Sequence, residues 1–91
     1  MVDQAFIGID VGTGSARAGI FDNSGALLGS AKQSFQMWRE AGHVVEQSSE
    51  EIWAAVCTAV RGAMAQAAIS PSAIRGIGFD ATCSLVVVDK A

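Results

Sequence analysis

Short apolar runs separated by turn residues fill the first third of the chain. The runs occupy residues 6–11, 15–21 and 26–35, and the segments GTG and DNSG lie between them. The second segment is typical of a tight turn, because Asp and Asn side chains bond nearby backbone and Gly accepts a positive φ. Connections this short join antiparallel strands, since a parallel return needs a crossover of about a dozen residues or more. The pattern therefore predicts a three-stranded antiparallel meander.

A helix is predicted to begin after residue 48. Ser48-Ser49-Glu50-Glu51 has the form of a capping box, in which the Ser48 hydroxyl accepts from the Glu51 backbone N–H and the Glu51 side chain reaches back. Apolar residues then recur at spacings of three and four, which places them on one helix face: Trp53, Val56, Val60, Met64 and Ala67. Aromatic side chains on such a face usually pack inside, so we predict that Trp53 belongs to the core. Ser70-Pro71 ends the helix and favours a single further turn.

The end of the chain returns to the β-type pattern. Residues 74–79 and 85–88 are predicted strands, whereas residues 36–47 show no clear period and are predicted to form a loop around Gly42. A meander, a crossover helix and a further strand pair make an α/β layer with a helix on one face. No strand follows the last apolar run, so we expect the chain to be the beginning of a longer protein.

Composition argues against several classes of function. Of the 91 residues, 51% are hydrophobic and 16% are charged, with a formal net charge of -3, which excludes a disordered tail. Such an apolar chain of this size has either a dense core or a surface that expects a partner. The six Lys and Arg residues are spread singly, which argues against nucleic acid as a partner. No apolar stretch approaches the roughly 20 residues of a membrane span, so no membrane partner is expected.

The amino terminus and the cysteines favour the cytoplasm. Residues 1–4 lack the positive flank and the apolar run of a secretory signal. Cys57 and Cys83 are therefore expected to be reduced thiols, and they form no C-x-x-C pair. The single histidine, His43, cannot supply a zinc cluster. The sequence leaves open whether the protein forms a homodimer.

The strongest candidate for chemistry is the segment GIDVGTGSARAGIFD, residues 8–22. Asp10 lies near the end of an otherwise apolar strand, where its carboxylate needs a cation, a donor or water, and it is a candidate magnesium ligand. The loop Gly12-Thr13-Gly14-Ser15 has no bulky side chain, so its backbone N–H groups and two hydroxyls can approach phosphate oxygens closely. Arg17, on the returning strand, adds positive charge at the same end of the hairpin. A plain hairpin with an exposed Asp and Arg is the alternative interpretation.

Two common phosphate-binding motifs do not fit this loop. A P-loop requires a Lys after its last Gly, and none is present. A dinucleotide fingerprint requires G-x-G-x-x-G at the start of a helix, whereas Arg17 stands at the third glycine position and a β-type run follows. A phosphate would have to be held by a turn between two strands, as in the actin-like ATPase superfamily.

Three segments together resemble the FGGY family of carbohydrate kinases. Residues 8–22 resemble the family's first phosphate motif, and VEQSSEEIW at 45–53 looks like the segment that opens its first helix. The third segment, GIGFDATCSLVVVD at 76–89, is similar to the sugar-site strand pair in kinases of ribulose and related five-carbon substrates. The segments occur in the family's order, although the chain would be only the beginning of a family member. The resemblance implies an actin-like, ribonuclease-H-like α/β fold, incomplete in this chain.

The resemblance also implies roles for single residues. Asp10 would act on the magnesium of MgATP. Residues around the ATP phosphates would be Gly12, Thr13, Gly14, Ser15 and Arg17, and those of the substrate site Ala81, Thr82 and Cys83. Glycerol-phosphorylating members have an Arg-Glu pair on this strand where Ala81 and Thr82 stand here, which argues against glycerol. The general base, an aspartate, and the adenine site would come from beyond Ala91, so the chain alone is expected to be inactive.

These features predict ATP-dependent phosphorylation of a five-carbon sugar or polyol, of the ribulose, ribitol or xylulose type, with ATP and Mg²⁺ as cofactors. The alternative is a non-catalytic actin-like ATPase that uses nucleotide as a conformational switch. Residues 81–84 distinguish the two, because a pure switch does not require them. A plain interaction fragment without a site is a weaker alternative.

A structural role is an alternative to a site role at four residues. His43 is expected in a loop, and Cys83 is expected to be a small buried hydrophobe more than a pocket residue. Trp38 either covers a sugar cleft or packs the loop. Asp80 follows an apolar residue, and it is either a structural hydrogen-bond acceptor or a substrate contact.

Overall fold

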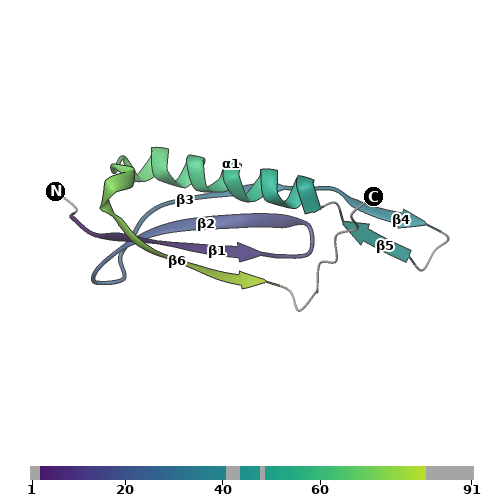
Figure 1. Ribbon diagram of the computed structural model, residues 1–91, viewed down its shortest axis with the longest axis horizontal. Coiled ribbons are helices and arrows are strands. Elements are labelled where there is room, and N and C mark those ends of the chain that lie inside the picture. Colours follow the sequence, from purple (N-terminus) through teal and green to yellow (C-terminus); the bar gives the residue numbers. More distant parts are fainter. Residues whose placement is uncertain (1–2, 41–43, 48, 82–91) are drawn as a thin grey trace.

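The fold is an α/β layer in which one long helix lies along a sheet (Figure 1). The computed structural model describes residues 3–40, 44–47 and 49–81. The elements in chain order are β1 (Ala5–Val11), β2 (Ser15–Asp22), β3 (Leu27–Ser34), β4 (Met37–Glu40), β5 (Val44–Gln47), α1 (Ser49–Ala67), the 3₁₀ turn η1 (Pro71–Ala73) and β6 (Ile74–Ala81). The predicted α/β class is confirmed.

β1, β2 and β3 form the predicted antiparallel meander. The turn between β2 and β3 is held by the Asp22 carboxylate, whose Oδ1 accepts from the backbone N–H groups of Ser24 at 2.8 Å and Ala26 at 3.0 Å. Gly25 has a φ of 87°, a conformation that side chains other than glycine rarely adopt. The turn chemistry that the sequence predicts for residues 22–25 is therefore present.

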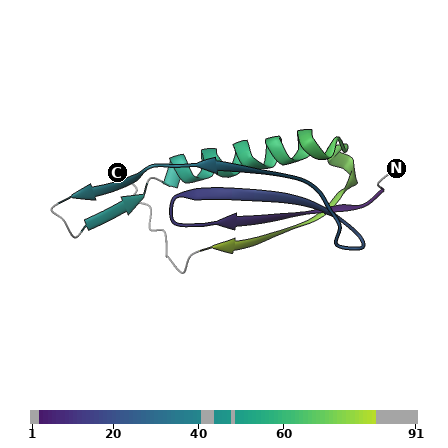
Figure 2. The same cartoon turned by 180° about the vertical axis from the view of Figure 1, so that it is seen from behind.

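β6 returns parallel to β1, which gives the sheet order β3-β2-β1-β6. The crossover between β3 and β6 includes α1, and Figure 2 shows this helix from behind, along the sheet. The predicted single turn is η1, where the Ser72 backbone N–H donates to the Ser70 hydroxyl at 3.3 Å. The second strand of the predicted final pair, residues 85–88, lies outside the described residues.

A two-stranded hairpin lies within the segment that the sequence predicts to be a loop. β4 and β5 pair antiparallel, from Met37↔Gln47 to Glu40↔Val44, in a separate small sheet. The loop prediction for residues 36–47 is therefore wrong over these two strands. Each strand has four residues and so offers only two positions per face, which is too short a run for alternation to stand out from the sequence.

The core lies between α1 and one face of the sheet. Alternate residues of β1 and β2 are buried there: Ala5, Ile7, Ile9, Ala16, Ala18 and Ile20. The helix contributes Ala55, Val56, Ala59 and Ala63. This stripe is small because the helix backbone lies close to β3: a Cβ built on Gly29 would stand 2.7 Å from the Ala63 carbonyl oxygen and 2.6 Å from the Ala67 nitrogen.

The predicted apolar face of the helix is only partly buried. Trp53 is 63% exposed, so the prediction that it belongs to the core is wrong for the part of the chain that is described. Val60, Met64 and Ala67 are half-buried and pack against the core. The helix turns its alanines toward the sheet because an alanine stripe permits a closer helix–sheet approach than a bulky indole.

Two polar side chains of α1 tie the helix to the strand layer. The Gln36 backbone N–H donates to Glu51 Oε1 at 2.7 Å, and the Ser30 backbone N–H donates to Gln66 Oε1. Ser48, the predicted cap residue, lies outside the described residues, and α1 begins at Ser49. The Glu51 carboxylate fixes the connection between β3 and β4 to the first turn of the helix.

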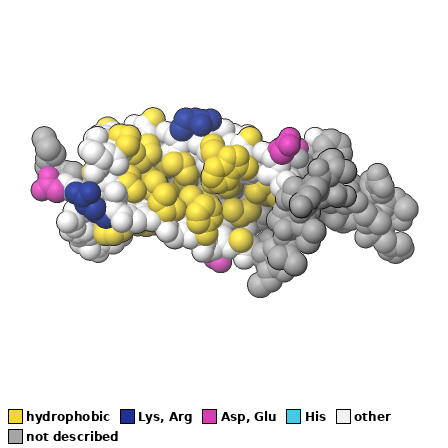
Figure 3. Space-filling model, viewed as in Figure 1, with side chains coloured by type: hydrophobic (Ala, Val, Ile, Leu, Met, Phe, Trp, Pro, Cys, Tyr) yellow, Lys and Arg dark blue, Asp and Glu magenta, His cyan; other side chains and the backbone are white. Residues whose placement is uncertain are grey.

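α1 lies over β3 and β2 and leaves β6 uncovered on the same face. Ile77 is 58% exposed and Phe79 is 61% exposed. Figure 3 shows apolar side chains gathered on this side of the molecule. The composition therefore reflects both a dense alanine core and an apolar surface. No helix in the described ranges is long and apolar enough to cross a membrane.

Candidate functional site

The face of the sheet opposite α1 has two rows of residues that run across the strands. The pairing register aligns the charged residues Lys32, Arg17, Asp10 and Asp80 in one row. The neighbouring row is Ser30, Gly19, Gly8 and Gly78. Residues paired across adjacent strands point to the same face, so the first row brings two cations and two carboxylates together.

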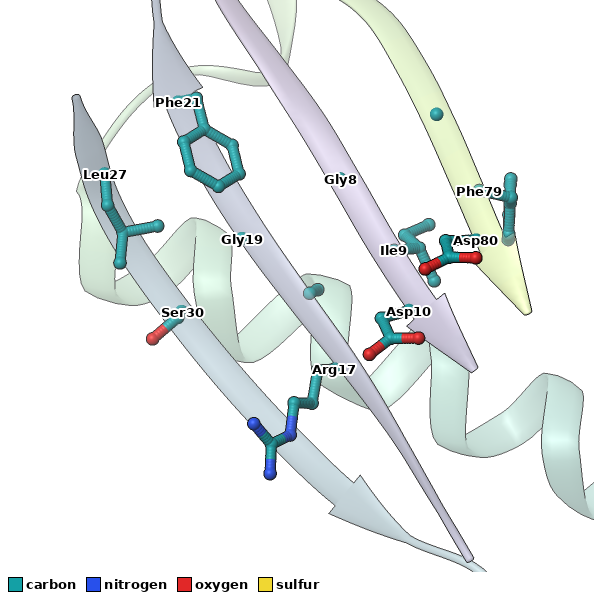
Figure 4. Close-up of a pocket in the computed structure, with 12 residues that line it drawn as sticks. Gly8, Ile9, Asp10, Arg17, Gly19, Phe21, Leu27, Ser30, Phe79 and Asp80 are labelled. Atoms are coloured by element: carbon teal, nitrogen blue, oxygen red, sulfur yellow. The ribbon is translucent and has the colours of Figure 1, made fainter. Parts of the chain in front are cut away.

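The charged row lies at the carboxyl ends of the parallel strands β1 and β6. The carboxylates of Asp10 and Asp80 lie side by side, and the Arg17 guanidinium extends away from them toward β3 (Figure 4). All three side chains are exposed. Within residues 3–40, 44–47 and 49–81, none of these side chains forms a hydrogen bond or an ion pair. The described residues therefore leave each of these side chains open to a ligand.

The loop between β1 and β2 is a tight turn with an open outer side. The Gly12 backbone N–H donates to the Ser15 carbonyl at 2.8 Å, and the Phe35 N–H donates to the Gly14 carbonyl at 3.0 Å. Phe35 is buried, so this bond fixes the loop to the end of β3. A Cβ at Gly14 would meet nothing within 4 Å. The loop therefore has room for a group that approaches its backbone closely.

A cavity of about 520 Å³ lies on the open face beside the charged row. The glycine row lies along it, Phe21 and Leu27 stand at one end, and Asp10, Arg17 and Asp80 stand at the other (Figure 4). The Phe21 ring leaves no room for a side chain at Gly19, because a Cβ there would stand 2.9 Å from the Phe21 Cε1 atom. A Cβ at Gly78 would meet nothing within 4 Å.

The structure brings together most of the residues that the sequence assigns to phosphate and metal. Thr13 is exposed and Ser15 is half-buried, and both lie in the loop between Asp10 and Arg17. Ala81 is the last residue of β6, whereas Thr82 and Cys83 lie outside the described residues. His43 lies outside them too, and nothing is described of the Trp38 side chain.

Asp80 accepts no hydrogen bond among the described residues, so it is no structural acceptor there. Asp22, in contrast, is structural: the Ser24 hydroxyl and backbone N–H groups of the turn lower the pKa of its carboxyl. No local pattern in the sequence indicates that Asp80 and Lys32 align with Asp10 and Arg17. Only the register of the long-range pairing places them in one row.

Comparison with known proteins identifies the family. Residues 5–91 match the amino-terminal domain of the FGGY family of carbohydrate kinases. The chain belongs to this family. It is 49% identical over 83 residues to the D-ribulokinase of Saccharomyces cerevisiae. This match covers 91% of this chain and 12% of the relative. It is also 49% identical over 88 residues to a human FGGY carbohydrate kinase domain-containing protein, covering 97% of this chain and 16% of that protein.

A solved structure supports the same conclusion about the fold. The crystal structure of a xylulose kinase from Brucella ovis matches with a TM-score of 0.80 and 27% identity, over 86% of this chain and 16% of that one. The FGGY resemblance and the actin-like fold predicted from the sequence are confirmed. FGGY members are phosphotransferases that act on a sugar or polyol hydroxyl. The chain spans less than a fifth of the length of these three relatives.

Proposed function

We propose that this chain is the amino-terminal part of a kinase that transfers the γ-phosphoryl group of ATP to a hydroxyl of a five-carbon sugar or polyol. The observation that carries the proposal is the open loop at residues 12–15, next to Asp10 and Arg17 on its two flanking strands. Family membership supports phosphoryl transfer to a sugar hydroxyl, and it favours the kinase over a nucleotide switch.

The proposed phosphate site uses the loop and Arg17. Backbone N–H groups of residues 13–15 and the hydroxyls of Thr13 and Ser15 would donate hydrogen bonds to phosphate oxygens, while the Gly12 N–H holds the turn through the Ser15 carbonyl. Arg17 supplies a planar, permanently charged donor that can turn from its exposed position toward the phosphates. Phosphoryl transfer requires little covalent chemistry from a protein, so these groups act by positioning and by stabilising charge.

The donor set fits magnesium that arrives with ATP. Mg²⁺ keeps several waters and takes one or two carboxylates together with substrate phosphates. The described residues contain no group of three or more His, Cys, Asp or Glu that could enclose a metal ion. Asp10, exposed beside the loop, is the residue that would hold the ion. Bound MgATP would supply the phosphoryl group and a positive charge against its oxygens.

A five-carbon acceptor is supported by the relatives and by the end of β6. Two of the matching proteins are a D-ribulokinase and a xylulose kinase. In the sequence, Ala81 and Thr82 stand where the family resemblance implies an Arg-Glu pair in glycerol-phosphorylating members, and Cys83 follows them. Small side chains at the acceptor site would leave room for a longer carbon chain. The base that takes the hydroxyl proton would come from the part of the enzyme beyond this chain.

The test is a substrate panel with the full-length enzyme. The protein is mixed with ATP and Mg²⁺ and with D-ribulose, L-ribulose, D-xylulose, ribitol or glycerol, and kcat/KM is measured for each. A five-carbon compound is expected to be the best substrate. Glycerol as the best substrate would refute the substrate class, and no transfer to any of the compounds would refute the reaction.

A further inference from the structure

Asp80 occupies a position on β6 that mirrors that of Asp10 on β1. The two residues are Cα partners in the parallel pair, so their side chains point to the same face of the sheet. Both line the open cavity together with Arg17 (Figure 4). In open α/β sheets, ligands bind at the carboxyl ends of the parallel strands, which is where these carboxylates lie.

The described fold gives Asp80 no structural task. Asp is depleted in strands, and like charges side by side across a strand pair are destabilising. The Asp80 side chain has no hydrogen bond or ion pair in the part of the chain that is described. Asp22 shows what a structural aspartate looks like in this chain, because its Oδ1 accepts from Ser24 Oγ at 2.7 Å and from two backbone N–H groups.

The described residues leave the space next to Asp80 open. Gly78 stands two residues earlier on the same strand and face, and a Cβ there would meet nothing within 4 Å. The described packing and a positive φ therefore do not require glycine at this position. A glycine in a strand interior often marks a site where a ligand or another backbone approaches closely. The carbon chain of a ligand can therefore lie over Gly78 while its polar groups reach Asp80.

We propose that Asp80 is a specificity-determining residue that accepts hydrogen bonds from hydroxyls of the acceptor sugar or polyol next to the hydroxyl that is phosphorylated. This inference rests on the proposed kinase function. The attacking oxygen must lie about 3–3.5 Å from the phosphorus atom. Neighbouring strands are about 4.8 Å apart, so a carboxylate one strand away from Asp10 reaches the next hydroxyls of the acceptor. An ionised carboxylate has two acceptor oxygens, which suits two adjacent hydroxyls.

The experiment compares Asp80→Asn and Asp80→Ala with the unsubstituted full-length enzyme. Asp3→Asn is the matched control, because Asp3 is exposed and lies before β1, away from the cavity. Hydrogen bonds to charged groups are strong, so the sugar KM is expected to rise on the order of 10- to 100-fold in Asp80→Ala and less in Asp80→Asn. The KM for ATP should stay within about twofold. Asp80→Asn keeps the shape and serves if Asp80→Ala does not fold.

Two further measurements separate contact from structure. For the unsubstituted enzyme, kcat/KM should be lower for a substrate analogue that lacks one adjacent hydroxyl than for the complete substrate. For Asp80→Ala, kcat/KM should be the same for the analogue and for the complete substrate, because the substitution and the missing hydroxyl remove the same hydrogen bond. Calorimetric titration of the sugar without nucleotide should show weaker binding by the Asp80 variants, independent of turnover.

Three results would overturn the inference. The first is an unchanged sugar KM in both Asp80 variants. The second is an unchanged sugar KM with a raised magnesium requirement, which would assign Asp80 to the metal beside Asp10. The third is equal loss from the analogue in every enzyme. A different outcome is that the unsubstituted full-length protein phosphorylates no sugar. This result would refute the kinase proposal itself, and the role of Asp80 with it, before any variant is compared.

Discussion

Substitution of Gly29 tests whether α1 is seated directly on the backbone of β3. A Cβ at this position would stand 2.6 Å from the Ala67 nitrogen, 2.7 Å from the Ala63 carbonyl oxygen and 3.0 Å from the Ala67 Cα. All three are backbone atoms, so no flexible side chain can move aside. Gly29→Ala therefore forces the carboxyl-terminal half of α1 away from the sheet.

The size of the effect follows from two opposing contributions. Overpacking a close contact costs about 1–3 kcal/mol. Replacing Gly by Ala restricts the unfolded chain, which returns about 0.4–1 kcal/mol where the backbone conformation allows it. We expect a net loss of about 1–2 kcal/mol for Gly29→Ala. Gly78→Ala is the matched control, since its Cβ meets nothing within 4 Å and only the favourable contribution remains.

Amide hydrogen exchange on peptides from α1 and β3 measures the effect in the full-length protein without requiring two-state unfolding. Each 1.4 kcal/mol changes a local opening equilibrium about tenfold, so exchange in these peptides should be about 5- to 30-fold faster in Gly29→Ala. The Gly78→Ala protein should exchange there like the unsubstituted protein. If both variants leave α1 equally protected, the close seating of the helix on Gly29 is wrong.

Three further predictions concern single side chains. Asp10→Asn should lower kcat of the full-length enzyme by at least about 10²-fold with an unchanged melting temperature, and a near-normal kcat at ordinary magnesium would make Asp10 a mere strand-end carboxylate. Hydrogen bonds in the turn lower the pKa of Asp22, so its carboxylate stabilises the fold above the unfolded-state pKa, and this contribution is lost as the pH falls through the lower folded-state pKa. Asp22→Asn should therefore lower the melting temperature at pH 6. The difference in melting temperature between Asp22→Asn and the unsubstituted protein should become smaller toward pH 3. Trp53→Ala should cost less than about 1 kcal/mol, well below the 3–5 kcal/mol typical of a buried aromatic, as measured by thermal unfolding.

The meander can be predicted because its turns depend on residues that are neighbours in the chain. Features that depend on contacts between distant residues cannot be predicted from local patterns. The turn at Asp22 is held by hydrogen bonds between neighbours in the chain, so the residue types in this segment are enough to predict it. The orientation of α1 depends on Gly29, which lies 20 or more positions before every residue of the helix, so the periodicity of the helix cannot indicate it. Periodicity alone therefore predicts a core position for Trp53, whereas alanines fill the face of the helix that is buried.

The candidate site shows the same division. The loop at residues 12–15 and its neighbours Asp10 and Arg17 are close in sequence, and their shared location follows from a single hairpin. Asp80 joins them only because β6 crosses back and pairs with β1 in one register. A shift of that pairing by one residue would turn the Asp80 side chain to the other face, so its place in the row is a tertiary fact.

The strand to which each charged residue belongs suggests that Asp80 has a different role from Asp10 and Arg17. Asp10 and Arg17 belong to β1 and β2, the two strands that flank the loop at residues 12–15, whereas Asp80 belongs to β6, which is not part of that hairpin. Groups that stabilise transferring phosphate must be held in a fixed geometry, and the hairpin holds Asp10 and Arg17 beside the loop. The acceptor is the partner that varies between relatives named for ribulose, xylulose and glycerol. A residue on a strand outside the phosphate hairpin can differ between family members without changing the groups of that hairpin, which is the arrangement expected if Asp80 selects the acceptor and Asp10 and Arg17 hold the donor.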